Sequence, residues 1–138
     1  MGQRRRAREL AVQVLFHLEY TPGDPEAAFS TVSESFSMPL AAHEFAKQLV
    51  LGVCEHLETI DRMIQKASRN WRLERMSRVD RNILRIGAFE VAYLKDIPAK
   101  VSIDEAVELG KRFGSRDSGS FINGILDNIF NPSGQSEE

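Results

Sequence analysis

Hydrophobic residues recur along most of this chain at the three- and four-residue spacing of an α-helix. Over residues 3–20, one helical face carries a row of small and aliphatic side chains: Ala7, Leu10, Ala11, Val14 and Leu18. No segment of the sequence shows the sustained two-residue alternation that is typical of a half-buried strand. The pattern therefore predicts an all-α fold with about seven helices.

Turn and capping residues divide the first half of this pattern into separate helices. Asp24 and Pro25 predict the N-cap and the first position of a short helix that runs to about Phe36. A longer apolar pattern covers residues 40–57, and residues 60–67 either extend it or start it again. The sequence leaves open whether these two stretches form one helix or two.

The second half has a strong amphipathic stripe over residues 78–94, followed by two further helices. Ser102, with Glu105 three residues later, matches a capping box and predicts that a helix opens there. The last helix is expected to start near Asp117, as its N-cap, and to stop at Pro132.

The length of the chain fits one domain. With 138 residues, one hydrophobic core can form, and a second independent core would be hard to fit. We predict a single domain over residues 1–138, with an N-terminal helical half at about 3–69 and a C-terminal half at about 77–131. The connection at 70–77 is the expected boundary, and residues 132–138 are expected to form a flexible tail.

Composition excludes several classes of protein. The single cysteine, Cys54, cannot form an internal disulfide, which fits a reducing compartment. No stretch approaches the roughly 18 consecutive apolar residues of a membrane span. The basic N-terminus is not followed by a small-residue cleavage site, which argues against a signal peptide. We therefore expect a cytoplasmic protein without a membrane partner.

No motif indicates catalysis, metal binding or a cofactor. The histidines, His17, His43 and His56, lack the spacing of metal ligands, and the sequence contains no phosphate-binding loop or nucleophile elbow. Cys54 lies in an apolar helical stripe, where a thiol is usually inert. Glu90 lies near an apolar face and is expected to be a buried carboxylate paired with an arginine. We therefore expect no enzyme activity, no metal and no cofactor.

Charge is distributed unevenly, although the net charge is only −2. Residues 1–8 contain four arginines and no acidic residue, and residues 62–85 contain eight basic residues against two acidic ones. Thirteen of the eighteen basic residues are arginines, whose planar guanidinium groups suit phosphates and stack on bases. This distribution favours a partner that carries phosphates or carboxylates.

The arginines of residues 1–8 destabilise the helix that they begin. A helix N-terminus carries a partial positive charge, so Arg4, Arg5, Arg6 and Arg8 each disfavour the helix by roughly a few tenths of a kcal/mol. Two interpretations remain open: a solvated, frayed end, or an arm whose arginines and exposed N–H groups contact phosphates.

Phe121 lies about 100° from the centre of the buried stripe of the last helix. Its ring is therefore either half exposed, as a platform for an unpaired base, or part of the edge of the core. Residues 115–120 surround the start of this helix with hydroxyl and N–H groups that suit an anion, whereas the charge of Asp117 would repel phosphate.

Arg78, Arg81 and Arg85 are spaced three and four residues apart and share one face of their helix. Such a face is either solvated or a contact surface for a protein or a nucleic acid. The sequence leaves both interpretations open.

Four segments, in order along the chain, resemble the NusB family of bacterial transcription antitermination factors. They are RRRARE (4–9), VDRNILRIGAFE (79–90), IPAKVSIDEAVEL (97–109) and DSGSFINGILD (117–127). Each motif alone is modest, but the ordered set is specific and spans nearly the whole chain, with the weakest match over about 22–70. The resemblance implies a NusB-like, all-α fold of two packed helical subdomains without catalytic activity.

The resemblance also implies partners and site residues. Similar proteins pair with the ribosomal protein NusE and bind single-stranded boxA RNA in ribosomal RNA leaders; with other Nus factors they help RNA polymerase read through termination signals. The residues corresponding to the RNA surface are Arg4, Arg5, Arg6, Arg8, Asp117, Ser118 and Phe121. The residues corresponding to the NusE contact are Phe16 and Asp80, where the family often has tyrosine and glutamate.

Two alternatives remain open. A similar helical module precedes the catalytic domain of some ribosomal-RNA cytosine methyltransferases, so the chain is alternatively a stand-alone relative of that RNA-binding module. It is alternatively a homo-oligomeric helical protein, such as a homodimer, whose basic arm pairs with its own acidic segments. The sequence contains no methyl-donor site, which favours the antitermination factor over the first alternative.

Overall fold

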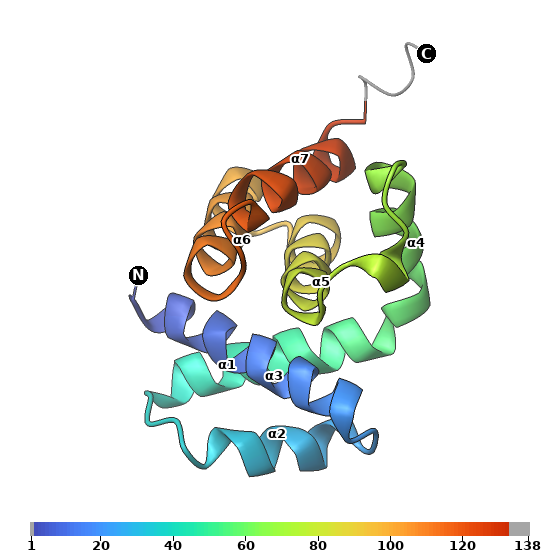
Figure 1. Cartoon of the computed structure of the whole chain (residues 1–138). Helices are drawn as coiled ribbons and strands as arrows, with labels where there is room; N and C mark the ends of the chain where they lie inside the picture. The colour runs from blue at the N-terminus through green and yellow to red at the C-terminus, as the bar shows by residue number, and fades with distance from the viewer. Residues whose placement is uncertain (1, 133–138) are drawn as a thin grey trace. The chain divides into compact units, whose positions relative to one another are not determined.

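Seven α-helices and one short 3-10 helix make up most of residues 2–132, the part of the chain that this computed structural model describes (Figure 1). They are α1 (Gly2–Tyr20), α2 (Pro25–Ser33), α3 (Leu40–Glu55), α4 (Leu57–Ser68), η1 (Leu73–Arg75), α5 (Arg78–Tyr93), α6 (Ala99–Phe113) and α7 (Ser118–Phe130). Residues 2–132 contain no strand, so the predicted all-α fold is confirmed. Residues 133–138 of the predicted tail lie outside the described residues.

The helices form two compact units, one that ends at His56 and one that begins at Leu57. The first unit contains α1, α2 and α3, and the second contains α4 to α7. The boundary was predicted at 70–77, but α4 packs against α5 and α7 and therefore belongs with the C-terminal helices. The connection at 70–77, which includes η1, lies inside the second unit.

In the first unit, α1 packs against both α2 and α3. The apolar face that the sequence predicted for α1 is fully buried at Leu10 and Val14. Leu49 and Val53 of α3 and Phe29 of α2 are buried as well. Burying side chains of this size contributes roughly 1.5–3 kcal/mol each. This packing fixes which face of α1 is turned outward.

In the second unit, α5 packs against α4, α6 and α7. Its buried face includes Ile83 and Leu84, and α7 contributes Ile122 and Leu126. Gly87 permits the close approach of α5 and α7, because a Cβ atom at this position would lie 2.7 Å from a methyl carbon of Leu126. The first turns of these two helices are joined by a hydrogen bond, and they form part of the candidate site.

One of the two capping predictions is confirmed and the other is wrong. Asp24 caps α2, because its carboxylate accepts a 3.0 Å hydrogen bond from the backbone N–H of Ala27. The capping box predicted at Ser102 is wrong, because α6 begins a turn earlier, after Pro98. Ser102 lies inside the helix, where its buried hydroxyl donates a 2.6 Å hydrogen bond to the buried carboxylate of Glu90.

Candidate nucleic-acid interface

Arg4, Arg5, Arg6 and Arg8, here called the basic arm, belong to the first turns of α1. This helix begins at Gly2, so the arm is helical and does not form a frayed end. The first turn of α1 contains no acidic residue, so no carboxylate there offsets the positive end of the helix. Arg4, Arg5 and Arg6 are exposed, and their guanidinium groups are accessible to a polyanion.

Aromatic rings of the same unit contact three arginines of the basic arm. The guanidinium carbons of Arg4 and Arg8 lie 4.8 and 5.3 Å from the ring centre of Phe45. That of Arg6 lies 5.3 Å from the ring centre of Phe36. Such cation–π contacts contribute roughly 0.5–1 kcal/mol at exposed positions. Arg8 is only 3% exposed, so it has little surface left for a ligand.

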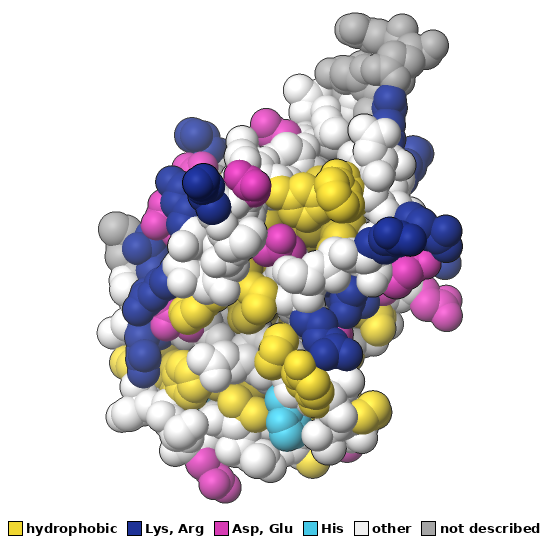
Figure 2. Space-filling view, viewed as in Figure 1, with side chains coloured by type: hydrophobic (Ala, Val, Ile, Leu, Met, Phe, Trp, Pro, Cys, Tyr) yellow, Lys and Arg dark blue, Asp and Glu magenta, His cyan; other side chains and the backbone are white. Residues whose placement is uncertain are grey.

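The C-terminal candidate residues line a hollow in the second unit, with a volume of about 230 Å³. Its walls come from the 71–77 connection, the first turn of α5 and residues 115–121. The lining residues are Trp71, Arg75, Met76, Ser77, Asp80, Ser115, Asp117, Ser118 and Phe121. Figure 2 shows hydrophobic side chains at the surface in the part of the view that the second unit occupies, with acidic and basic side chains around them. The hollow combines three of the expected RNA-binding residues with Asp80, for which the family resemblance implies a contact with NusE.

Ser118 anchors the start of α7. Its hydroxyl donates a 2.7 Å hydrogen bond to Asp80 Oδ1 and accepts a 2.9 Å bond from the backbone N–H of Ser115. Asp80 lies in the first turn of α5, where Ser77 caps the helix by accepting a 3.1 Å bond from the Asp80 backbone N–H. Because Ser118 is only 1% exposed, its hydroxyl is not available at the surface. Its side chain instead stabilises the wall of the hollow.

Asp117 and Phe121 both have exposed surface at the hollow. Asp117 occupies the predicted N-cap position of α7, but its exposed carboxylate makes no capping hydrogen bond. Phe121 is half-buried, so part of its ring is open to a ligand. The ring meets the indole of Trp71 edge-on, with centroids 6.0 Å apart and planes at 84°.

Trp71 and Arg75 line the hollow but were not among the predicted site residues. Their segment was predicted to be a connection between helices within the arginine-rich residues 62–85, with no site residue assigned to it. A signal was available, because Trp71 is the only tryptophan and stands in an arginine-rich segment without an apolar helical pattern. No local pattern could show that Phe121, far later in the chain, would be its neighbour.

An exposed ion pair lies beside this hollow. Arg72 donates a 3.0 Å hydrogen bond to the carboxylate of Glu74. The pKa of Glu74 is lowered from its usual range, first by a hydrogen bond with its own backbone and then by Arg72. Arg75 lowers the pKa of Glu74 further, so Glu74 interacts with both arginines, of which only Arg75 lines the hollow.

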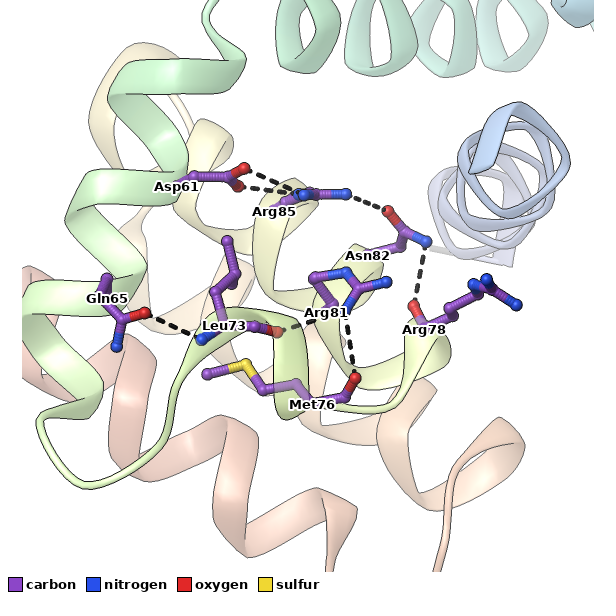
Figure 3. A network of polar contacts seen from close by, with 8 residues as sticks. All are labelled: Asp61, Gln65, Leu73, Met76, Arg78, Arg81, Asn82 and Arg85. Atoms are coloured by element: carbon purple, nitrogen blue, oxygen red, sulfur yellow. Dashed lines mark hydrogen bonds and ion pairs between the residues drawn. The ribbon is translucent and has the colours of Figure 1, made fainter. Parts of the chain in front are cut away.

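Two arginines of the basic segment 62–85 make hydrogen bonds to other residues of the second unit (Figure 3). Arg85 donates to both carboxylate oxygens of Asp61, at 2.8 and 3.0 Å. Arg81 donates to the backbone carbonyls of Leu73 and Met76, at 3.2 and 3.1 Å. These side chains join α4 and the 70–77 connection to α5, so they serve the fold instead of forming the solvated face or docking surface considered from the sequence.

Phe16, the other predicted NusE contact, lies on α1 in the first unit. Its half-buried ring meets the ring of Tyr20 edge-on, with centroids 5.2 Å apart. Tyr20 is 61% exposed, so the pair offers an aromatic surface near the end of α1. Asp80 belongs to the second unit.

The described candidate residues offer cationic and aromatic side chains. Within residues 2–132, no group of three His, Cys, Asp or Glu side chains lies close enough to hold a metal ion. None of the helices in that part of the chain is long and apolar enough to cross a membrane. The basic arm offers cations for phosphates, and the hollow offers aromatic rings for bases.

Comparison with known proteins agrees with the motifs in the sequence. The model of the NusB family matches residues 5–131. The chain is 50% identical over 133 residues to the transcription antitermination protein NusB of Myxococcus xanthus (strain DK1622), with 94% of this chain and 95% of that protein covered. Among solved structures it is similar to T. maritima NusB, with a TM-score of 0.85, 38% identity, and 98% and 97% of the two chains covered. It is also similar to a chain in the crystal structure of antitermination factors NusB and NusE in complex with dsRNA, with a TM-score of 0.87, 32% identity, and 96% and 98% covered. The chain therefore belongs to the NusB family.

Proposed function

We propose that this protein is a transcription antitermination factor that binds single-stranded boxA RNA of ribosomal RNA leaders together with NusE. Membership of the NusB family supports this class of function. The basic arm is the observation that carries RNA binding, because Arg4, Arg5 and Arg6 are exposed at a helix end that itself favours anions. A phosphate backbone would offset the repulsion between these charges and the helix dipole.

RNA binding uses two surfaces in this proposal, one in each unit. The basic arm contacts phosphates, which gives affinity without reading the sequence. The hollow offers the ring of Phe121 to an unpaired base. Asp117 limits how closely a phosphate can approach the hollow, because its carboxylate is exposed there. Ser118 contributes by holding the start of α7.

NusE is the proposed protein partner, and the crystal structure of related antitermination factors NusB and NusE supports this choice. Phe16, packed against Tyr20, would supply an aromatic contact from α1. Asp80 would supply a charge from α5 through the carboxylate oxygen that does not accept the hydrogen bond of Ser118. Because Asp80 also lines the hollow, NusE and RNA would bind adjacent parts of the second unit.

The proposed role is that of a binding factor without catalytic activity. It acts in the cytoplasm on nascent transcripts, with RNA polymerase and other Nus factors. The exposed arginines can contact RNA phosphates, and the half-buried phenylalanine can stack on a base.

A titration of labelled single-stranded boxA RNA, at low and high salt and with and without NusE, tests this function. We expect NusE to strengthen binding, and log affinity to fall with log salt by about 0.7 for each phosphate neutralised. A scrambled RNA of the same length is the control and should bind more weakly. Absence of RNA binding at every salt concentration with NusE present would refute the proposal. Sedimentation at two protein concentrations would reveal a homo-oligomer that sequesters the basic arm.

A further inference from the structure

Trp71 is a large aromatic side chain that the fold leaves exposed. It is 54% exposed, and its ring meets the ring of Phe121 in a T-shaped arrangement with a centroid distance of 6.0 Å. An aromatic ring contributes most to stability when it is buried, and tryptophan is enriched at surfaces where one molecule contacts another. The hydrogen bonds around Trp71 show that its position is indeed defined.

Gln65 of α4 fixes the backbone around Trp71. Its Nε2 donates a 2.7 Å hydrogen bond to the carbonyl of Trp71, and its Oε1 accepts a 2.8 Å bond from the N–H of Leu73. Ser68 donates to the same Trp71 carbonyl at 2.8 Å. Figure 3 shows Gln65 reaching from α4 to Leu73. Side chains of α4 therefore set the place of Trp71, although its ring is not packed in the core.

The rest of the connection is fixed from α5. Arg81 donates to the carbonyls of Leu73 and Met76, at 3.2 and 3.1 Å (Figure 3). Two residues before Trp71, Arg69 adopts a left-handed backbone conformation with φ of 42°, which residues other than glycine rarely occupy. Arg69 directly follows the end of α4, where a left-handed residue commonly ends a helix, and it turns the chain into the connection. The connection is therefore a preformed wall of the hollow.

The hollow beside Trp71 suits an unpaired nucleobase. Its walls include two aromatic rings and the cation Arg75, and bases stack on aromatic faces and on guanidinium planes. We propose that Trp71 is a second base-stacking residue of the RNA site, beside Phe121, and that Gln65 is a positioning residue that holds it there. This inference rests on the proposed RNA-binding function and identifies the hollow as the site where one unpaired base of the RNA binds.

A peptide segment of a protein is the competing occupant, and two observations favour the base. The volume of about 230 Å³ lies below the roughly 300–1,000 Å³ of pockets for drug-sized ligands and suits one ring system. The guanidinium plane of Arg75 adds a surface on which a base can stack, whereas the carboxylate of Asp117 disfavours a phosphate or an acidic peptide side chain there.

The first test measures affinity for a labelled, single-stranded boxA RNA of about 12 nucleotides. Trp71→Ala should weaken binding about tenfold, whereas Trp71→Phe, which keeps an aromatic ring, should weaken it less than about threefold. Phe130→Ala is the matched control, because Phe130 is 57% exposed on the same helix as Phe121 but does not line the hollow. It should leave the affinity unchanged. Circular dichroism and thermal melting confirm that each variant is folded.

The second test identifies the base. A set of RNAs, each with one abasic position, is titrated against the wild type and Trp71→Ala. One abasic position should weaken binding to the wild type about tenfold, and the same position should have little further effect in Trp71→Ala. This non-additivity is expected when Trp71 contacts that base, and full additivity at every position would overturn the inference.

The third test addresses Gln65. Because Trp71 is the only tryptophan, its fluorescence reports on this site alone. Gln65→Ala should increase quenching by acrylamide and weaken RNA binding about threefold. In a Trp71→Ala background, Gln65→Ala should have no further effect on RNA affinity. An equal further loss in that background would show that Gln65 acts elsewhere and would overturn its positioning role.

The outcomes separate this inference from the proposed function. Wild-type RNA binding that Trp71→Ala leaves unchanged overturns the inference and leaves the function intact. If Trp71→Ala weakens the binding of NusE and leaves the binding of RNA unchanged, Trp71 belongs to the protein contact. This result also overturns the inference. A wild type that binds no RNA, even with NusE, refutes the proposed function itself.

Discussion

The hydroxyl of Ser118 donates a 2.7 Å hydrogen bond to Asp80, which joins the first turn of α7 to the first turn of α5. The same hydroxyl accepts a hydrogen bond from the backbone of Ser115, in the segment before α7. Two helix starts and a loop are thus held around one buried oxygen. The hollow that contains Phe121 depends on this arrangement, because these three segments form much of its wall.

We expect Ser118→Ala to lower the free energy of unfolding by about 1–3 kcal/mol, because it removes hydrogen-bond partners from Asp80 and Ser115. Urea unfolding measures this change. Ser120→Ala is the control, because Ser120 is exposed and its hydroxyl donates only to the Asp117 carbonyl, at 3.2 Å. It should change stability by less than about 0.5 kcal/mol. Equal stabilities of the two variants would contradict the anchoring role.

Replacing Arg5 and Arg6 together by alanine should weaken RNA binding and flatten its dependence on salt. Each phosphate contact that is lost should reduce the slope of log affinity against log salt by about 0.7. The fold should remain intact, because both residues are exposed. Arg62→Ala serves as a control, since that side chain is 73% exposed on α4 and lies outside both candidate surfaces. An unchanged salt slope in the double variant would mean that the basic arm is merely solvated.

Asp117→Asn should leave RNA affinity equal or raise it, because it removes a negative charge beside the hollow. Its stability should hardly change, since the Asp117 side chain makes no capping hydrogen bond. RNA titration and thermal melting measure the two effects separately. A large loss of affinity in a variant of normal stability would show that the carboxylate itself contacts a base.

Arg85→Ala should lower the free energy of unfolding by about 2 kcal/mol or more, because it leaves the carboxylate of Asp61 without its bidentate partner. The side chains of this pair are only 13% and 24% exposed. The matched control is Arg72→Ala, which breaks the Arg72–Glu74 pair, whose side chains are 75% and 67% exposed. That loss should be below about 1 kcal/mol. Similar losses for both variants, measured by urea unfolding, would contradict the structural role of Arg85.

The elements that could be predicted from the sequence are those marked by nearby residues, such as a helical spacing of apolar side chains or a capping residue. The spacing of Leu10 and Val14 identified the buried face of α1, and Asp24 identified the start of α2. The break between α3 and α4 was harder to place, because the chain turns at His56 without a proline or glycine and apolar residues recur on both sides. Helical periodicity alone could not show that α4 packs with the C-terminal helices.

The remaining features depend on contacts between residues distant in sequence. Ser102 and Glu105 have the spacing of a capping box, but the hydroxyl of Ser102 bonds to Glu90 of another helix. Arg81 and Arg85 have the spacing of a solvated face, but carbonyls and a carboxylate from other segments bind them. The position of Trp71 beside Phe121 likewise follows from tertiary packing.

Each unit is built from one uninterrupted stretch of chain, with the division between His56 and Leu57. During translation, all three helices of the first unit are therefore synthesised before any helix of the second. The contacts among α1, α2 and α3 all fall within this first stretch of chain, so none of them requires the second unit. The core of α1, α2 and α3 can thus close while the ribosome is still extending the chain. Arg8 and Phe45 both belong to this first unit, so early closure would bring the guanidinium of Arg8 to the ring of Phe45 before the second unit exists.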